Sequence, residues 1–255
     1  MTKHLLANRT EHEILWFQRR NFLQAAALWT SLGGTLGAQA QSRSNIVTLV
    51  GDAQANGNRL LPQNTIRNGD ELVTGPGSSL VFVMGDSSFH LRQNSRLKVE
   101  GDAGGAVVNA LRLLTGGVIS VWGKGPQRKI STPTMTAGIR GTGVYTEVFP
   151  EQDNRSYFCT CYGTVDLEAS TERKLVEADY HVAYWGEPTA RNGLLLTPGP
   201  LLNHTDEELE YLAQLVNQRT TWQITGRKGA KDGSSYGTYG SSGSSDPSGY
   251  GKTSP

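Results

Sequence analysis

Short segments that alternate between apolar and polar residues, separated by glycine, dominate the chain from residue 45 to residue 149. Seven such segments are rich in valine, threonine or aromatic residues: 45–51, 70–75, 78–85, 87–92, 95–101, 116–123 and 143–149. A period of two residues indicates a strand with one buried face, and Gly, Asn and Asp between the segments are typical of turns. We therefore predict an all-β fold, either a meander or β-roll or a sandwich of short antiparallel strands.

One clear helical pattern lies near the other end of the chain, in residues 203–222. Thr205 is a suitable N-cap, and Glu208 three residues later completes a capping box. The helix dipole favours the acidic first turn, whose carboxylates we expect to be solvated: Asp206, Glu207 and Glu208. An apolar stripe should dock this helix on the sheet: Leu209, Leu212, Ala213 and Val216. The preceding residues 186–200 contain three prolines and are predicted to form a loop.

The first 40 residues have the features of an export signal. Paired arginines precede an apolar run that is too short for a stable membrane span, and a small-x-small cleavage site follows. The pattern resembles a twin-arginine signal, from which Gln18 and Gln24 depart. We expect a periplasmic protein that begins near Gln41 after processing, without a stable membrane span; an uncleaved helical anchor is the alternative. The signal residues are Arg19, Arg20, Phe22, Leu23, Ala38 and Ala40.

Composition divides the remaining chain into three parts. Residues 41–168 are predicted to form the β domain, and residues 169–225 a β extension with the capped helix. Residues 226–255 are rich in Gly, Ser and Tyr and are expected to be disordered, because they cannot bury enough apolar surface to offset the entropy of ordering. With 24 basic and 23 acidic residues, the chain has no charge excess suited to nucleic acid. The partner we expect is another envelope protein or a cell-wall polymer.

A family resemblance appears in four segments of this β-rich region. NGDELVTGPGSSLVFVMGDSSFHLRQNSRLKV, LLTGGVISV, ISTPTMTAGIRGTGVYTEV and GTVDL resemble the FecR-type periplasmic domain, over roughly residues 46–168. The resemblance implies an all-β domain that, in its best-known members, relays a signal from an outer-membrane receptor to a sigma factor. Those members begin with a sigma-binding segment and a membrane span, neither of which we recognise here, so we do not expect an anti-sigma role. The most specific motif residues are Thr132, Pro133, Gly138, Arg140, Gly141 and Thr142.

This motif also has a physical interpretation of its own. Pro133 lacks an N–H donor and belongs at a sheet edge or at the start of a strand. Gly141 and Gly143 predict a bulge or tight bend within the strand that follows. Arg140 is the one charged residue of MTAGIRGTGVYT, and it either anchors a ligand or donates hydrogen bonds to carbonyls of the turn.

The only two cysteines, Cys159 and Cys161, lie two residues apart in a strand-like segment, 155–169. Alternation places both thiols on one face of that strand, together with Tyr157. Three interpretations stay open: a buried structural pair, a redox pair, or two ligands of a metal or cofactor. A disulfide would be strained, because Cα atoms two residues apart on a strand are separated by about 6.5–7 Å, near the limit for such a bond.

A third ligand for such a metal can come from a neighbouring strand. His181 follows the cysteine strand and would complete a set suited to copper(I), zinc or a haem-type iron. His204 precedes the predicted helix, and His90 between two apolar residues is expected to face solvent. The candidate metal ligands are therefore Cys159, Cys161 and His181, and the cofactor they would hold is a transition metal.

The sequence carries no enzyme signature such as Gly-x-Ser-x-Gly, His-Glu-x-x-His or a phosphate loop, so we expect no catalytic activity. The favoured function is an exported FecR-like binding or signal-responsive module of the periplasm. One alternative is a small periplasmic protein that carries a metal or cofactor at the cysteines. Another is an envelope scaffold tethered by its tail.

Overall fold

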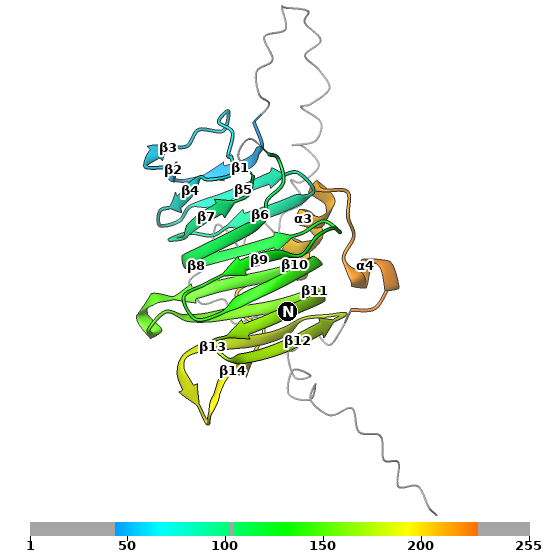
Figure 1. Ribbon diagram of the computed structural model, residues 1–255. Helices are drawn as coiled ribbons and strands as arrows, with labels where there is room; N and C mark the ends of the chain where they lie inside the picture. Colours follow the sequence, from blue (N-terminus) through cyan, green and yellow to red (C-terminus); the bar gives the residue numbers. More distant parts are fainter. Residues whose placement is uncertain (1–43, 103–104, 229–255) are drawn as a thin grey trace, which may run out of the picture.

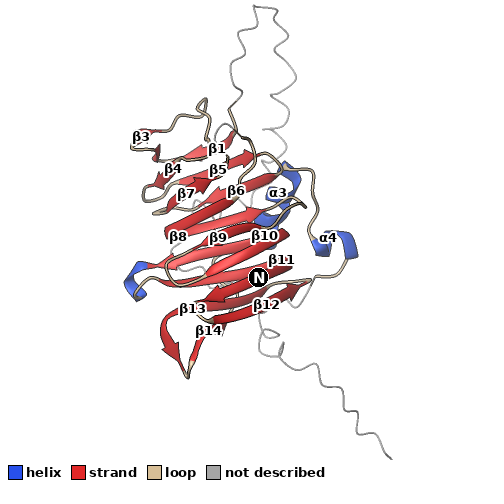
Figure 2. Ribbon diagram, in the orientation of Figure 1, coloured by secondary structure: helices blue, strands red, loops and turns tan. Residues whose placement is uncertain are grey.

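The computed structural model describes residues 44–102 and 105–228, so the six signal residues from Arg19 to Ala40 and residues 229–255 lie outside the described residues. Strands dominate the described part of the chain (Figure 2), where no helix is long and apolar enough to cross a bilayer. The strands are β1 (Ile46–Val50), β2 (Ala53–Ala55), β3 (Asn58–Arg59), β4 (Glu71–Thr74), β5 (Ser79–Met84), β6 (Ser87–Leu91), β7 (Arg96–Glu100), β8 (Ala110–Val121), β9 (Arg128–Ser131), β10 (Thr136–Phe149), β11 (Arg155–Ala169), β12 (Glu172–Ala178), β13 (Val182–Arg191) and β14 (Leu194–Gly199). The helices are α3 (Asp206–Leu215) and α4 (Thr221–Thr225), and a 3-10 turn spans Pro150–Gln152.

These strands form one hydrogen-bonded sheet whose pairing changes halfway along the longest strands. The first half of β8 pairs with β7 and β9, and its second half with β6 and β10. The first half of β11 likewise pairs with β13, and its second half with β12. All pairings are antiparallel, as predicted, except the short parallel contact between β8 and β9. Figure 1 shows the strands stacked along the molecule, with both helices on the same side.

Buried apolar side chains form two clusters, one on each face of the central strands. The first, here called the strand core, takes side chains from nearly every strand, among them Phe82, Leu97, Val118, Phe158 and Leu167. The second, here called the helix-side core, lies between the strands and the helices and includes Ile119, Tyr145, Cys159, Leu212 and Trp222. Burial on both faces explains the long apolar runs in the central strands.

All seven strand segments expected from the sequence are confirmed, as β1, β4, β5, β6, β7, β8 and β10. The prediction of a loop over residues 186–200 was wrong, because β13 and β14 form a hairpin there. Its turn is Asn192-Gly193, with φ of 51° and 80°. Both values suit the type I′ turn for which Asn-Gly is the preferred sequence. The three prolines of this segment favoured a loop, although its Asn-Gly pair indicates a hairpin turn.

Helix α3 begins as the sequence predicts. Thr205 accepts a hydrogen bond from the Glu208 backbone N–H, and the Glu208 side chain accepts one from the Thr205 N–H. The predicted apolar stripe packs in the helix-side core, and Ser88 of β6 donates a hydrogen bond to the Leu212 carbonyl at 2.7 Å. The helix ends at Leu215, and α4 then starts with a capping box of its own at Thr220.

The bulge predicted around Gly141 and Gly143 is confirmed, because the register between β10 and β11 shifts at this point. Opposite it, Gly163 of β11 has a φ of 94°. Before Gly163, Cys159 and Cys161 belong to the helix-side core, whereas Val165 after it belongs to the strand core. The irregularity therefore exchanges the two faces of β11 and confines both thiols to the face that the helices cover.

Candidate metal centre

Cys159 and Cys161 lie on β11 with their thiols in the helix-side core, while Phe158, the residue before Cys159, packs in the strand core. The prediction that both sulfurs share one face of a strand is confirmed. Both residues are fully buried and both thiols are free. Their sulfur atoms are 3.8 Å apart, too far for a disulfide bond.

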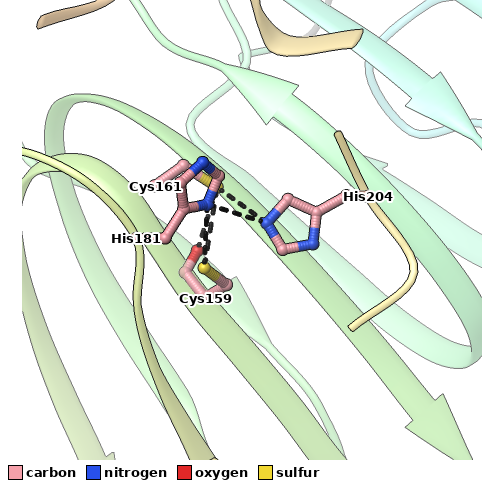
Figure 3. Close-up of side chains that lie close together, drawn as sticks. All are labelled: Cys159, Cys161, His181 and His204. Carbon is pink, nitrogen blue, oxygen red and sulfur yellow. Dashed lines mark hydrogen bonds between the residues drawn. The ribbon is translucent and has the colours of Figure 1, made fainter. Parts of the chain in front are cut away.

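Two histidines complete a compact group with these thiols (Figure 3). His181 Nδ1 lies 3.5 Å from Cys159 Sγ, and His204 Nε2 lies 3.4 Å from Cys161 Sγ. The two inward-facing ring nitrogens are 3.1 Å apart. All four residues are buried, and their four nearest ligand atoms lie within 4.8 Å of one another. We call this group the Cys2His2 cluster.

Each histidine is positioned by the backbone around it. His181 stands one residue before β13, where its N–H donates to the Cys161 carbonyl at 2.9 Å and its φ is 23°. His204 stands in the segment that joins β14 to the N-cap of α3. A positive φ at a non-glycine residue is uncommon and costs free energy. At His181 it turns the ring toward the cysteines.

The outer nitrogen of each histidine also has a partner. His181 Nε2 lies 3.0 Å from Asp206 Oδ1 at the start of α3, and His204 Nδ1 lies 2.5 Å from the Leu202 carbonyl oxygen. Asp206 is held in turn by Lys228 at 3.2 Å. The Trp222 ring of α4 stacks on the His181 ring, with 5.3 Å between centroids. These contacts fix the orientation of both imidazole rings.

The electrostatics of the cluster separate the two thiols. Burial alone raises the pKa of Cys159, but the hydrogen bond from Cys161 and the charge of His204 outweigh it and lower this pKa well below its usual value. Burial and the adjacent Cys159 sulfur raise the pKa of Cys161 well above its usual value. Burial lowers the pKa of His181, but its bonds to Asp206 and Cys159 prevail and raise it to about 9. The cluster thus stabilises one thiolate next to a protonated histidine.

The carboxylates at the start of α3 differ from the sequence expectation. Asp206 and Glu208 are buried, so the prediction of a solvated acidic turn was wrong for both. Burial raises the pKa of Asp206, but the hydrogen bond and charge of His181 and the contact with Lys228 lower it to about 2. Glu208 forms an ion pair with Arg92 at 2.6 Å. Both carboxylates therefore join the start of α3 to the strands, Asp206 through His181 and Glu208 through Arg92.

His90 was predicted to face solvent, and this prediction was wrong. Its side chain is 1% exposed and its Nε2 lies 2.8 Å from Ser79 Oγ. Every residue of β6 is buried, because α3 covers the face of this strand that the alternation pattern assigned to water. His90 belongs to the polar contacts between β6 and α3 and not to the Cys2His2 cluster.

None of the family-motif residues belongs to the Cys2His2 cluster. Thr132 and Pro133 form the turn between β9 and β10, as a proline at a strand start requires, and Thr132 Oγ1 donates to the Met135 carbonyl at 3.1 Å. Gly138 and Arg140 lie on β10, followed by the bulge at Gly141 and Thr142. The Arg140 side chain is exposed and, within residues 44–102 and 105–228, donates no hydrogen bond to the turn. The turn-carbonyl interpretation of Arg140 therefore finds no support.

A hollow of about 500 Å³ beside the 3-10 turn is lined by Arg92, Asn94, Tyr145, Glu147 and Asn203, among others. Its buried carboxylate, Glu147, accepts a hydrogen bond from Asn203 at 2.7 Å. No cysteine or histidine lines it. The hollow can accommodate a small polar ligand, but it offers neither a nucleophile with an adjacent base nor a metal site.

Sequence reasoning identified Cys159, Cys161 and His181 but missed His204 and Asp206. A usable signal existed, because His204 directly precedes the N-cap of the one predicted helix, and the apolar stripe of that helix requires it to dock on the sheet. Docking brings the first turn of the helix against the strand face that carries the thiols. His204 and Asp206 could have been named from that step.

Comparison with known proteins supports the family resemblance. The FecR protein family model matches residues 70–166. This segment runs from the start of β4 into the second half of β11. A search of curated proteins gives no match.

Among solved structures, the chain is similar to two crystal structures of a proposed anti-sigma factor from Parabacteroides distasonis. The sequence identities are 12% and 11%, and the TM-score is 0.42 for each. The matched region covers 57% of this chain and 63% and 64% of those chains, which is less than two thirds of their length.

Proposed function

We propose that this protein is an exported, non-catalytic FecR-type module of the periplasm that binds another envelope protein and responds to a signal there. The observation that carries this proposal is the FecR match over residues 70–166. The all-β fold agrees with it, and the hollow beside the 3-10 turn lacks a catalytic set. The proposed location rests on the signal-like sequence of the first 40 residues.

Arg140 is the residue we propose for partner contact. It belongs to the most specific family segment, its side chain is exposed, and no ion pair within the described ranges holds its guanidinium. An arginine kept at a surface without a structural partner is suited to bidentate recognition of a carboxylate. We therefore propose that Arg140 and the bulge beside it form the binding surface.

The test is cross-linking of the full chain in the envelope of living cells, followed by identification of the attached protein. Arg140→Glu should lose the cross-linked partner while its thermal unfolding midpoint stays unchanged. The matched control is Arg112→Glu, which makes the same charge change at another exposed strand position. Equal cross-linking by wild type and Arg140→Glu would refute the proposed surface, and a failure to find any specific partner would refute the function.

A second candidate function, a small metal-carrying protein, is favoured by the Cys2His2 cluster. It is independent of partner binding, because the motif residues around Arg140 do not belong to the cluster.

A further inference from the structure

We propose that the Cys2His2 cluster binds one Zn²⁺ ion in a closed tetrahedral site that fastens the C-terminal helices to the sheet. Two sulfur and two imidazole nitrogen ligands are a donor set that zinc prefers for structural sites. Four protein ligands leave no position for water or substrate, so the site stabilises the fold and is not a catalytic centre.

Four of the six distances between the ligand atoms are close to those of a tetrahedral zinc site. Bonds of about 2.3 Å to sulfur and about 2.0–2.1 Å to nitrogen place the ligand atoms about 3.8 Å apart for S–S, about 3.5–3.6 Å for S–N and about 3.3–3.4 Å for N–N. The cluster has 3.8 Å between its sulfurs, 3.5 and 3.4 Å between sulfur and nitrogen, and 3.1 Å between its nitrogens. These four distances agree with the tetrahedral values to within roughly 0.3 Å. The two remaining sulfur–nitrogen pairs lie within 4.8 Å, so a bound ion would draw these ligands closer together.

The hydrogen bonds of the outer ring nitrogens direct the inner lone pairs at one another. His181 Nε2 faces the Asp206 carboxylate and His204 Nδ1 faces the Leu202 carbonyl, and both partners are acceptors. Each outer nitrogen therefore carries the proton, and a neutral ring then presents a bare lone pair at its inner nitrogen. Two such lone pairs only 3.1 Å apart repel unless a cation or a proton lies between them. Histidines that bind zinc use this carboxylate or carbonyl arrangement.

Charge balance favours a divalent ion over copper(I). Without metal, the Cys159 thiolate is balanced by the protonated His181 beside it and Cys161 keeps its thiol proton, so the four side chains have no net charge. When Zn²⁺ binds, the two sulfurs bond to the metal as thiolates, two protons leave to solvent and the net charge stays zero, with no change of oxidation state. Copper(I) with two thiolates would leave one uncompensated negative charge in a fully buried site. Burial of an unpaired charge is strongly unfavourable.

The four ligands come from three separate parts of the chain: β11, the turn before β13, and the segment before α3. The metal would therefore connect the sheet to the point where the helical segment begins, and Asp206 of α3 adds a contact to the His181 ring. Because all four ligands are buried, the ion must enter as the chain folds, and chelators should remove it only when the helical segment opens.

The proposal is tested by elemental analysis and native mass spectrometry of the full chain purified from the envelope of zinc-replete cells. We expect one zinc per chain in the wild type and none in Cys161→Ser or His204→Ala. The matched control is His90→Gln, which changes a buried histidine outside the cluster and should keep its zinc. Asp206→Asn should keep the four ligands but bind zinc roughly 10–100-fold more weakly.

A refolding experiment on the wild type covers the case in which the ligand variants fail to fold. The protein is unfolded with a chelator and refolded with or without Zn²⁺. Zinc at a free concentration a thousand times its Kd should raise the unfolding midpoint by roughly 8–16 °C. Metal-free wild type with an unchanged midpoint after zinc addition would overturn the proposal. Stoichiometric copper in place of zinc would overturn the choice of metal.

Discussion

At the scale of single residues, unusual backbone conformations position the groups of the candidate site. Gly163 at a φ of 94° exchanges the two faces of β11 just after Cys161, and His181 at a φ of 23° directs its ring toward the thiols. Glycine adopts a positive φ without strain, whereas at His181 it costs free energy that the surrounding packing must offset. Such strain is often found where a structure must hold side chains in one arrangement, and here it holds four ligand atoms within 4.8 Å.

At the same scale, the ion pair between Arg155 and Glu187 allows a prediction about stability. The guanidinium of Arg155 donates two hydrogen bonds to Glu187, at 2.8 and 2.6 Å, and lies 3.9 Å from the centre of the Trp185 ring. Glu187→Gln should lower the free energy of unfolding by roughly 2–3 kcal/mol at neutral pH, because Arg155 then loses its charged partner but keeps some contact with water. Urea unfolding measures this change, and the exposed Glu151→Gln is the control.

The same pair predicts a pH dependence. Burial raises the pKa of Glu187, but its hydrogen bonds to Arg155 and Thr197 prevail and lower it. A carboxylate whose pKa is lower in the folded state stabilises the fold above its unfolded pKa of about 4.3 and loses this effect as the pH falls. The stability difference between wild type and Glu187→Gln should therefore shrink from pH 7 to pH 3. A constant difference would contradict this account of the pair.

Three of the four ligands could be predicted from local sequence, and the fourth could not. The alternation of residues 155–169 was enough to place Cys159 and Cys161 on one face, and proximity along the chain suggested His181. His204 depends on how α3 docks on the sheet, which brings together positions 43 residues apart in the hydrogen bond to Cys161. Contacts across that distance are set by tertiary packing and not by local pattern.

At the scale of elements, the alternation of apolar and polar residues was enough to predict strands, but the hairpin turn at Asn192-Gly193 was not recognised. The seven alternating segments became strands, whereas the hairpin of β13 and β14 was mistaken for a loop because of its prolines. One of those prolines, Pro198, is exposed on the edge strand β14, where a missing N–H donor is tolerated. Prolines at a sheet edge therefore do not exclude a strand.

The bulge of β10 and β11 can be tested through Gly163. A Cβ atom at this position would lie 2.5 Å from Thr142 Cγ2, whereas a Cβ at Gly193, which also has a positive φ, meets nothing within 4 Å. Gly193→Ala should cost roughly 1 kcal/mol, at the low end for backbone strain, because its φ of 80° lies in an exposed turn. Gly163→Ala should cost roughly 1–3 kcal/mol more, because it also overpacks the core.

Chemical unfolding of the two glycine variants measures this difference. Gly163→Ala should also disturb the position of Cys161 two residues earlier, so its metal content should fall if the zinc proposal holds. Equal free energies of unfolding for the two variants would show that β11 accommodates a Cβ at Gly163 without cost. Tight packing of Gly163 against Thr142 would then be refuted.

At the scale of the whole molecule, the proposed function depends on export, which the first 40 residues are predicted to direct. Replacing both Arg19 and Arg20 by lysine should leave the protein in the cytoplasm with its signal attached, because twin-arginine signals are read through their guanidinium groups. Fractionation followed by mass determination of the chain tests this. Normal export and processing of the double-lysine variant would refute the twin-arginine assignment.

The central structural claim is that four side chains from separate parts of the chain form one tetrahedral zinc site. X-ray absorption at the zinc edge of the purified full-length protein tests it most directly. The account predicts a first shell of two sulfurs at about 2.3 Å and two imidazole nitrogens at about 2.0–2.1 Å. A shell made of oxygen and nitrogen alone, or a preparation without a zinc edge, would contradict it.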